Sequence, residues 1–459
     1  MSDILNKGAT LTLEITDLNN LGFGVGHAPD GRAIFVAGCV AGDTARVQII
    51  KVNKGYAVAR LLEIITPSPD REDGFCSAAA SCGGCVYRYL SYERELALKQ
   101  NYVAHAFRKA GLADVEVESV RTTGQTKHYR NKAEYPIANG KNGLYGGFYA
   151  PKTHRVVAAD ACSLQPPVFG EILRATCEFF TARGVSAYDE ETGEGLLRHL
   201  YLRHGVGSGE LMVTPVINGD SLPFAKEYVA MLRERFPTVS SVLVNINQKN
   251  TNVVLGKTFH TLHGNPYLTD VLCNRTFRIA PDAFYQVNHD AAELLYGIAA
   301  EQTGLKGKGL LLDLYCGAGT IGLSMAHLAS ELVGIEIVPA AVECAKKNAA
   351  RNGVQNAAFY CGDAADTEKL LAEAEAARGT LHPDVVILDP PRKGCDKALL
   401  DFLAARDVPR IVYVSCGPDS LARDCAILRT HGYEIGRVTP VDLFPRTGHV
   451  ESVVCLTKH

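Results

Sequence analysis

The sequence predicts an α/β fold: a doubly wound parallel sheet, preceded by a small β-barrel and a central α+β region. Two observations lead to this prediction. From about residue 281 helix and strand patterns alternate to about 430 and then end in two strands, which is typical of a parallel sheet with an antiparallel end. Residues 1–66, in contrast, contain several short strand patterns and no helix pattern.

The bulk composition is that of a large globular protein. Its 459 residues are 47% hydrophobic and 21% charged, with a net charge of −3. No apolar run approaches the ~18 residues that a membrane span needs, and the first residues, MSDILNKGAT, lack an apolar secretory core. We therefore expect a cytoplasmic protein with no membrane contact. The near-neutral charge does not decide for or against nucleic acid, because a whole-chain sum hides local patches.

Residues 1–66 predict a barrel of the OB type. LTLEITDL alternates apolar and polar residues, and Asn53-Lys54-Gly55 is the strongest hairpin signal. The prolines of TPSPD then predict a linker.

The middle of the chain predicts two interleaved domains. Residues 67–90, which hold a cysteine-rich loop, and 125–280, which mix strand and helix patterns, are expected to form the central domain. An amphipathic helix begins at SYERELALKQ and is closed by a glycine, so we assign residues 91–124 together with 281–459 to the doubly wound domain.

The stretch GLLLDLYCGAGTIGLSMAHLA predicts a strand, a glycine loop and a helix. Gly317, Gly319 and Gly322 fit the dinucleotide pattern, and Glu336 ends the next strand, where it could bind ribose hydroxyls. A dinucleotide-dependent oxidoreductase is therefore one alternative. Asp313 argues against it, because a carboxylate beside the glycine loop would repel a pyrophosphate.

The same carboxylate favours a cationic ligand without phosphate, and S-adenosylmethionine has an ammonium group and a sulfonium. A third acid, Asp363 in FYCGDAAD, ends the third strand, where it could accept a hydrogen bond from an adenine amino group. Three acids after three successive strands are more specific than the glycine pattern alone. We therefore predict a methyltransferase.

The fourth strand, PDVVILDPPRKG, indicates which atom receives the methyl group. Enzymes that methylate exocyclic amines carry an aromatic residue after D-P-P to stack on the base, and here Arg392 takes that place. Carbon 5 of a pyrimidine is the better target. It becomes nucleophilic only after a thiolate has added to carbon 6, and a base must later remove its proton.

Cys416 and Glu451 are the candidates for these two tasks. Cys416 in YVSCGPDSL follows a buried strand, and ligands of open α/β sheets bind beyond the carboxyl ends of the strands. Glu451 opens the last strand, after a loop that Pro445 and Gly448 make tight.

Together these motifs resemble those of the bacterial RNA uracil-C5 methyltransferases, and most closely the group that acts on 23S ribosomal RNA. FYQVN, DLYCGAGTIG, GIE, LDPPRKG, YVSCGP and DLFPRTGHVES carry the resemblance, which covers essentially the whole chain. It implies a Rossmann-like class I methyltransferase domain, a TRAM domain at 1–66, Cys416 as nucleophile and Glu451 as proton acceptor. The methyl-donor site that it implies consists of Gln286, Tyr315, Glu336, Asp363 and Asp389.

Two residues near this site keep alternative roles. Asp389 faces donor and target, and it could hold either the uracil edge or the donor. Phe284, two residues before Gln286, could stack on a base or pack in the ordinary way.

FCSAAASCGGCVY places Cys76, Cys82 and Cys85 in one loop. In a reduced compartment such thiolates suit zinc or an iron–sulfur cluster. Cys162, in a turn beside prolines, is a better fourth ligand than Cys177 on an apparent helix. The spacing leaves zinc open; the resembling family carries a [4Fe-4S] cluster on this pattern, which implies a structural cluster here.

Two basic motifs predict contacts with the RNA backbone, with a solvated polar face as the alternative for each. They are KHYRNKAEYP, with Lys127, His128, Arg130 and Lys132, and LLRHLYLRHG, with Arg198, His199, Arg203 and His204.

The expected partner is 23S ribosomal RNA, with no obligate protein partner. The barrel and the cysteine loop favour it over transfer RNA, because smaller transfer-RNA enzymes of the family lack both. A non-catalytic RNA-binding or ribosome-assembly factor is the alternative from another class, and the presence of both Cys416 and Glu451 argues against it.

Overall fold

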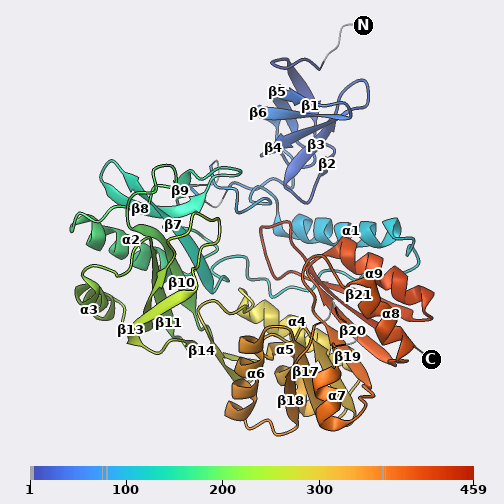
Figure 1. Cartoon of the computed structure of the whole chain (residues 1–459). Coiled ribbons are helices and arrows are strands. Elements are labelled where there is room, and N and C mark those ends of the chain that lie inside the picture. The colour runs from blue at the N-terminus through green and yellow to red at the C-terminus, as the bar shows by residue number, and fades with distance from the viewer. Residues whose placement is uncertain (1–4, 75, 79–80, 364–365, 367–368, 459) are drawn as a thin grey trace.

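The computed structural model describes residues 5–74, 76–78, 81–363, 366 and 369–458. Within these residues the strands form a six-stranded sheet, two seven-stranded sheets and a two-stranded hairpin. Figure 1 shows the N-terminal sheet above the other two, with the central sheet and the C-terminal sheet side by side below it. Phe75, Ala79 and Ala80 of the predicted cysteine-rich loop lie outside the described residues.

The N-terminal sheet has the order β1-β5-β6-β4-β3-β2. The predicted hairpin at Asn53–Gly55 is confirmed, because the amide of Asn53 donates to the carbonyl of Tyr56 at 2.8 Å between β5 and β6. Alternate residues of the strands turn inward, and Ile34, Val47 and their neighbours form a separate apolar core. The strands are β1 (Thr10–Glu14), β2 (Asp17–Leu18), β3 (Phe23–His27), β4 (Ala33–Ala37), β5 (Thr44–Val52) and β6 (Tyr56–Thr66).

The central sheet is mixed, with the order β13-β12-β11-β10-β7-β8-β9. Helix α2 begins at a proline, which suits the first helical turn, and it buries Phe169 and Phe180 in the core under the sheet. The elements are β7 (Lys132–Gly140), β8 (Gly143–Tyr149), β9 (Val156–Ala158), α2 (Pro167–Thr181), β10 (Leu197–His204), β11 (Leu211–Ile217), α3 (Ala225–Arg235), β12 (Val239–Ile246) and β13 (Thr258–Gly264), followed by the hairpin β14 (Leu268–Leu272) and β15 (Arg275–Ile279).

The C-terminal sheet has the order β18-β17-β16-β19-β20-β22-β21, and it is the predicted doubly wound sheet. Six strands run in the same direction, five of them paired in parallel, and the last strand, β22, runs antiparallel between β20 and β21. The elements are α4 (His289–Thr303), β16 (Leu310–Leu314), α5 (Thr320–Met325), β17 (Glu331–Glu336), α6 (Pro339–Arg351), β18 (Ala357–Cys361), α7 (Ala372–Arg378), β19 (Val385–Leu388), α8 (Lys397–Ala405), β20 (Arg410–Ser415), α9 (Pro418–Thr430), β21 (Glu434–Val441) and β22 (Glu451–Thr457).

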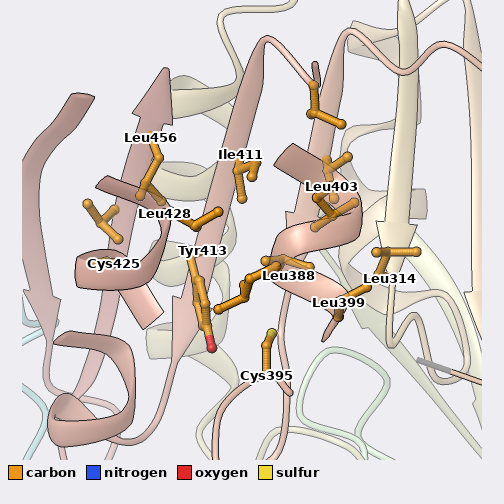
Figure 2. Close-up of a cluster of buried hydrophobic side chains, with 14 of the residues drawn as sticks. Leu314, Leu388, Cys395, Leu399, Leu403, Ile411, Tyr413, Cys425, Leu428 and Leu456 are labelled. Atoms are coloured by element: carbon orange, nitrogen blue, oxygen red, sulfur yellow. The ribbon is translucent and has the colours of Figure 1, made fainter. Parts of the chain in front are cut away.

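Apolar cores cover both faces of this sheet, as expected for parallel strands between two helix layers. Figure 2 shows part of one of them, where Leu388 and Tyr413 of neighbouring strands meet Leu399 of α8 and Leu428 of α9. Helix α1 (Tyr92–Lys109) adds Phe107 to the same core and lies beside α9 in Figure 1. No helix in the described part of the chain is long and apolar enough to cross a membrane.

Candidate active site

Cys416 and Glu451 lie at the same edge of the C-terminal sheet. Strands β20 and β22 are antiparallel, and their last registered pair at this edge is Ser415 with Ser452. Cys416 follows the first of these serines and Glu451 precedes the second, so the two stand one position beyond that pair. Residues opposite each other on antiparallel strands have Cα atoms about 4.5–5.5 Å apart, so this register brings the thiol and the carboxylate together.

Neither residue has an ordinary environment. Glu451 is 4% exposed, and its burial and the nearby Asp389 raise the pKa of its carboxyl to about 8, against the opposing effect of Arg392. Cys416 is half-buried, and burial, together with the charges of Glu451 and Asp389, raises its pKa to about 11. Arg392 is exposed and lowers both pKa values, so it is the cation of this group.

A cavity of about 340 Å³ opens beside the glycine loop between β16 and α5. Three of the five predicted donor-site residues, Tyr315, Glu336 and Asp389, line it. Glu336 accepts a hydrogen bond from the amide of Gly317 at 3.1 Å, which ties the end of β17 to the glycine loop. Three carboxylates, those of Asp282, Glu336 and Asp389, line this cavity, and its lining includes no arginine or lysine, which suits a cationic ligand better than a phosphate.

The other two predicted donor-site residues do not line this cavity. Asp363 lines a neighbouring cavity of about 450 Å³, which shares Tyr315 and Glu336 with the first. Gln286 is 7% exposed, and its backbone carbonyl accepts a hydrogen bond from Asn131 at 2.8 Å. The structure therefore brings four of the five residues together around two adjoining cavities, and Gln286 lines neither of them.

Asp313 has a different place from the one the sequence suggested. It is 1% exposed and does not line the donor cavity; its carboxylate accepts a hydrogen bond from the amide of Gly322 at 2.9 Å. Burial raises its pKa to about 7. Asp313 thus fixes the start of α5 under the glycine loop, while Asp282, Glu336 and Asp389 supply the acids that line the cavity.

Sequence reasoning missed part of the cavity wall. Tyr296 of α4 lines it, and its hydroxyl lies 3.4 Å from the hydroxyl of Thr320 in α5. A tyrosine on an amphipathic helix gives no sequence signal that distinguishes a ligand wall from core packing. Phe284, also at the cavity, is 79% exposed, so ordinary packing does not explain it, and a stacking surface is the better interpretation.

The four predicted metal-ligand cysteines line one cavity of about 170 Å³. Burial and the neighbouring thiols of Cys162, Cys82 and Cys76 raise the pKa of Cys85 to about 12. In the described part of the chain, no three His, Cys, Asp or Glu side chains lie close enough to hold a single metal ion. The four thiols therefore line one cavity.

The second basic motif is largely wrong as a prediction of RNA contacts. Arg198 and Arg203 of β10 are 5% and 3% exposed, and His199 is 7% exposed. Arg198 donates to the carbonyls of Asn247 at 2.8 Å and Lys249 at 2.7 Å. These hydrogen bonds hold the loop that follows β12. In the first motif, Lys127 and His128 are exposed.

Arg203 has a comparable task. It donates to the carbonyls of Ala280 at 3.2 Å and Ala283 at 2.7 Å, which hold the segment that carries Phe284.

A doubly wound sheet with an acidic cavity at its glycine loop, and with a thiol and a carboxylate at the same edge, defines a Rossmann-like methyltransferase. Residues 265–459 match the family model tRNA (Uracil-5-)-methyltransferase, and residues 5–62 match the TRAM domain. The chain belongs to the RNA uracil-5-methyltransferase family, and it is an S-adenosylmethionine-dependent enzyme of that family. This family membership excludes both alternative functions, the dinucleotide-dependent oxidoreductase and the non-catalytic RNA-binding factor.

Similar proteins share the whole length of the chain. An uncharacterized RNA methyltransferase of Clostridium tetani is 40% identical over 453 residues, 99% of this chain and 97% of its own. Another, of Halalkalibacterium halodurans, is 38% identical over 455 residues, 98% of each chain. Among solved structures, the tRNA (uracil-54, C5)-methyltransferase of Pyrococcus abyssi, in complex with S-adenosyl-L-homocysteine, is 27% identical with a TM-score of 0.78, covering 97% of this chain and 100% of that one.

Proposed function

We propose that this enzyme transfers a methyl group from S-adenosylmethionine to carbon 5 of a uridine in 23S ribosomal RNA, with Cys416 as nucleophile and Glu451 as base. The observation that carries this proposal is the register of β20 and β22, which puts both residues at one edge of the sheet, where Asp389 also faces the donor cavity. We also propose a cytoplasmic location and three domains, at residues 1–66, at 67–90 with 125–280, and at 91–124 with 281–459.

The reaction requires the two residues at different times. The Cys416 thiolate adds to carbon 6 of the uracil, and the electron pair of the 5,6 double bond moves into an enolate. Carbon 5 then takes the methyl group, and the sulfur of the donor would keep the electron pair of the broken bond and leave as the neutral thioether. Glu451 removes the remaining proton from carbon 5, the double bond re-forms, and the sulfur leaves carbon 6 as a thiolate.

The residues that would hold the methyl donor are Tyr315, Glu336, Asp363 and Asp389. The resemblance adds Gln286 to this set. Bound there, S-adenosylmethionine supplies an electrophilic methyl group on a sulfonium. The carboxylates of Glu336 and Asp389 orient a cationic ligand toward the edge of the sheet where Cys416 lies. Arg392 faces the two reacting residues and favours their anionic forms.

The raised pKa values predict how activity depends on pH. Glu451 (pKa about 8) and Cys416 (pKa about 11) are both protonated at neutral pH in the free enzyme, and both act as anions. We therefore expect kcat/KM for methyl transfer to rise about 10²-fold between pH 7 and 9, because this step requires the Cys416 thiolate, whose fraction increases about tenfold per pH unit below a pKa of about 11. Single-turnover methylation of RNA in buffers of constant ionic strength measures this. A flat or falling profile would contradict the assigned roles.

We also propose that Cys76, Cys82, Cys85 and Cys162 hold a structural [4Fe-4S] cluster. All four thiols line one cavity, and the resembling family carries such a cluster on this cysteine pattern. Zinc bound by four thiolates is the alternative. No step of methyl transfer requires the cluster.

This assignment predicts a visible absorbance. Protein purified without oxygen should absorb near ~400 nm, as thiolate-bound clusters do, and should contain iron. Cys85→Ser should lose both signals, while Cys177→Ala should keep them, because Cys177 is buried in α2 and does not line the cysteine cavity. Zinc in place of iron, with no absorbance in the visible range, would favour the alternative metal.

Transfer RNA is the second candidate substrate. The expectation that the barrel and the cysteine loop separate ribosomal from transfer-RNA enzymes is weakened, because the Pyrococcus abyssi enzyme, named for uracil 54 of tRNA, aligns with nearly the whole chain. The resemblance in the motifs still favours 23S ribosomal RNA.

The deciding experiment maps 5-methyluridine in total RNA from the source strain with and without this protein. We expect one or more uridines of 23S ribosomal RNA to lose the modification and regain it on complementation. Loss confined to transfer RNA would move the assignment to that substrate.

A further inference from the structure

The loop at residues 442–450 leads from β21 into Glu451. Its first residue, Asp442, directly follows Val441, which pairs with Glu451 across the two strands. The position of this loop therefore sets where the base stands. Asn288 donates to the carbonyl of Leu443 at 3.0 Å, and further anchors come from segments more than 300 residues earlier in the chain.

The first anchor is a buried cation. Lys99 of α1 is 1% exposed, and its ammonium group donates to Asp442 at 2.8 Å, to the carbonyl of Phe444 at 3.1 Å and to Glu95 at 2.7 Å. All three N–H donors of Lys99 are thus used, and two of its three partners belong to the loop. Asp442 and Glu95 are both fully buried.

The second anchor is Glu95 itself, one helical turn before Lys99. Its carboxylate also accepts a hydrogen bond from the amide of Arg446 at 2.7 Å. Arg446 has a φ of +69°, a left-handed backbone conformation that residues other than glycine rarely adopt. Its guanidinium donates to the carbonyl of Leu90 at 2.7 Å, so both its backbone and its side chain hold the loop against α1.

Further contacts add to this support, among them the hydrogen bond from the hydroxyl of Tyr129 to the carbonyl of Pro445 at 2.9 Å. The hydroxyl of Tyr92 donates to the second carboxylate oxygen of Asp442 at 2.9 Å. At the far end of the loop, a side chain added to Gly448 would collide with the carbonyl oxygen of Asn20 from the N-terminal sheet. The loop is therefore enclosed from two sides by elements outside the sheet that carries Cys416.

We propose that Lys99, through Asp442 and with Glu95, is a positioning residue that aligns Glu451 for removal of the carbon 5 proton. The inference rests on the proposed function of Glu451. Stability alone does not explain the arrangement, because a buried ion network often contributes no more to folding than apolar residues of the same volume. A base displaced by about 1 Å, in contrast, can slow a reaction by about 10²-fold.

The role predicts a defect in one step only. Addition of Cys416 and methyl transfer do not use Glu451, whereas release of the product does. In single turnovers with uridine RNA and radiolabelled methyl donor, Lys99→Met should form the methylated protein–RNA adduct at a rate within about threefold of the parent and release it about 10²-fold more slowly. Adduct that survives denaturing electrophoresis should therefore accumulate. Parent enzyme should accumulate little.

Lys397→Met is the matched control. Lys397 makes the same kind of ion pair, with Asp401 at 2.6 Å, but on the exposed surface of α8 and away from the loop. It should release product at the parental rate. Glu95→Gln is the conservative variant: an amide oxygen can still accept from Arg446 and Lys99, so release should stay within about fivefold of the parent.

Three outcomes would overturn the inference. The first is that folded Lys99→Met releases product at the parental rate, and the second is that it loses adduct formation and release by the same factor. If Lys99→Met does not fold, by circular dichroism and thermal unfolding, Tyr92→Phe decides: it removes one hydrogen bond to Asp442, and unchanged release there rejects the role. If parent enzyme forms no adduct with 5-fluorouridine RNA, the covalent function itself fails, which is a separate result.

Discussion

Replacement of Cys416 with alanine should abolish formation of 5-methyluridine, with a loss of at least about 10⁴-fold in rate, because carbon 5 is not nucleophilic without the thiolate at carbon 6. S-adenosylmethionine should still bind, since Cys416 does not line the donor cavity. Methyl incorporation into RNA and isothermal titration with the donor measure the two effects.

Incubation with 5-fluorouridine RNA gives the sharper readout. Fluorine at carbon 5 cannot leave as a proton, so the parent enzyme should remain covalently bound after methyl transfer, whereas Cys416→Ala should not. Cys455→Ala, at a cysteine of β22 away from Glu451, should behave like the parent. An adduct that persists in Cys416→Ala would show that another residue is the nucleophile.

The second large effect is expected for Glu451→Gln. The glutamine keeps the shape of the side chain but cannot take the proton, so the methylated adduct should form on ordinary uridine RNA and decay about 10³-fold more slowly than in the parent. Stopped reactions analysed by denaturing electrophoresis and by methyl label follow both steps. Loss of adduct formation in this variant would place Glu451 in the first step rather than the last.

The same variant should not lose stability at alkaline pH. The pKa of Glu451 is raised from 4.5 to about 8 in the folded protein, so its contribution to stability is present below pH 4.5 and is lost as the pH rises through about 8. Glutamine resembles the protonated form. At pH 9 the melting temperature of Glu451→Gln should therefore equal or exceed that of the parent, which differential scanning fluorimetry can test.

The sequence predicted the sheet and the placement of Cys416, because both depend on local patterns. A buried strand followed by a helix start at Pro418 put the thiol at the carboxyl end of a strand. The pairing of Cys416 with Glu451 was not predictable in the same way. It depends on the antiparallel register of β20 and β22, a contact between segments that periodicity does not connect.

Charged residues were the weakest part of the sequence interpretation. Arg198 and Arg203 suggested an RNA-facing strand because arginine is usually exposed, but both are buried and hydrogen-bonded to backbone carbonyls. Lys99, in contrast, received no functional assignment from the sequence, because it looks like an ordinary polar position of an amphipathic helix. Its partner Asp442 lies 343 residues away, and nothing local to either residue signals the contact.

The antiparallel course of β22 limits how this enzyme can diverge. Side chains alternate between the two faces of a strand, so a slip of one residue against β20 would carry the carboxylate of Glu451 to the opposite face. Insertions and deletions between β21 and β22 are compatible with turnover only when the loop changes shape and the register of β22 against β20 stays the same. In evolving or engineered descendants, changes in chain length should therefore accumulate elsewhere on the scaffold, while the spacing from Glu451 to the middle of its own strand stays constant.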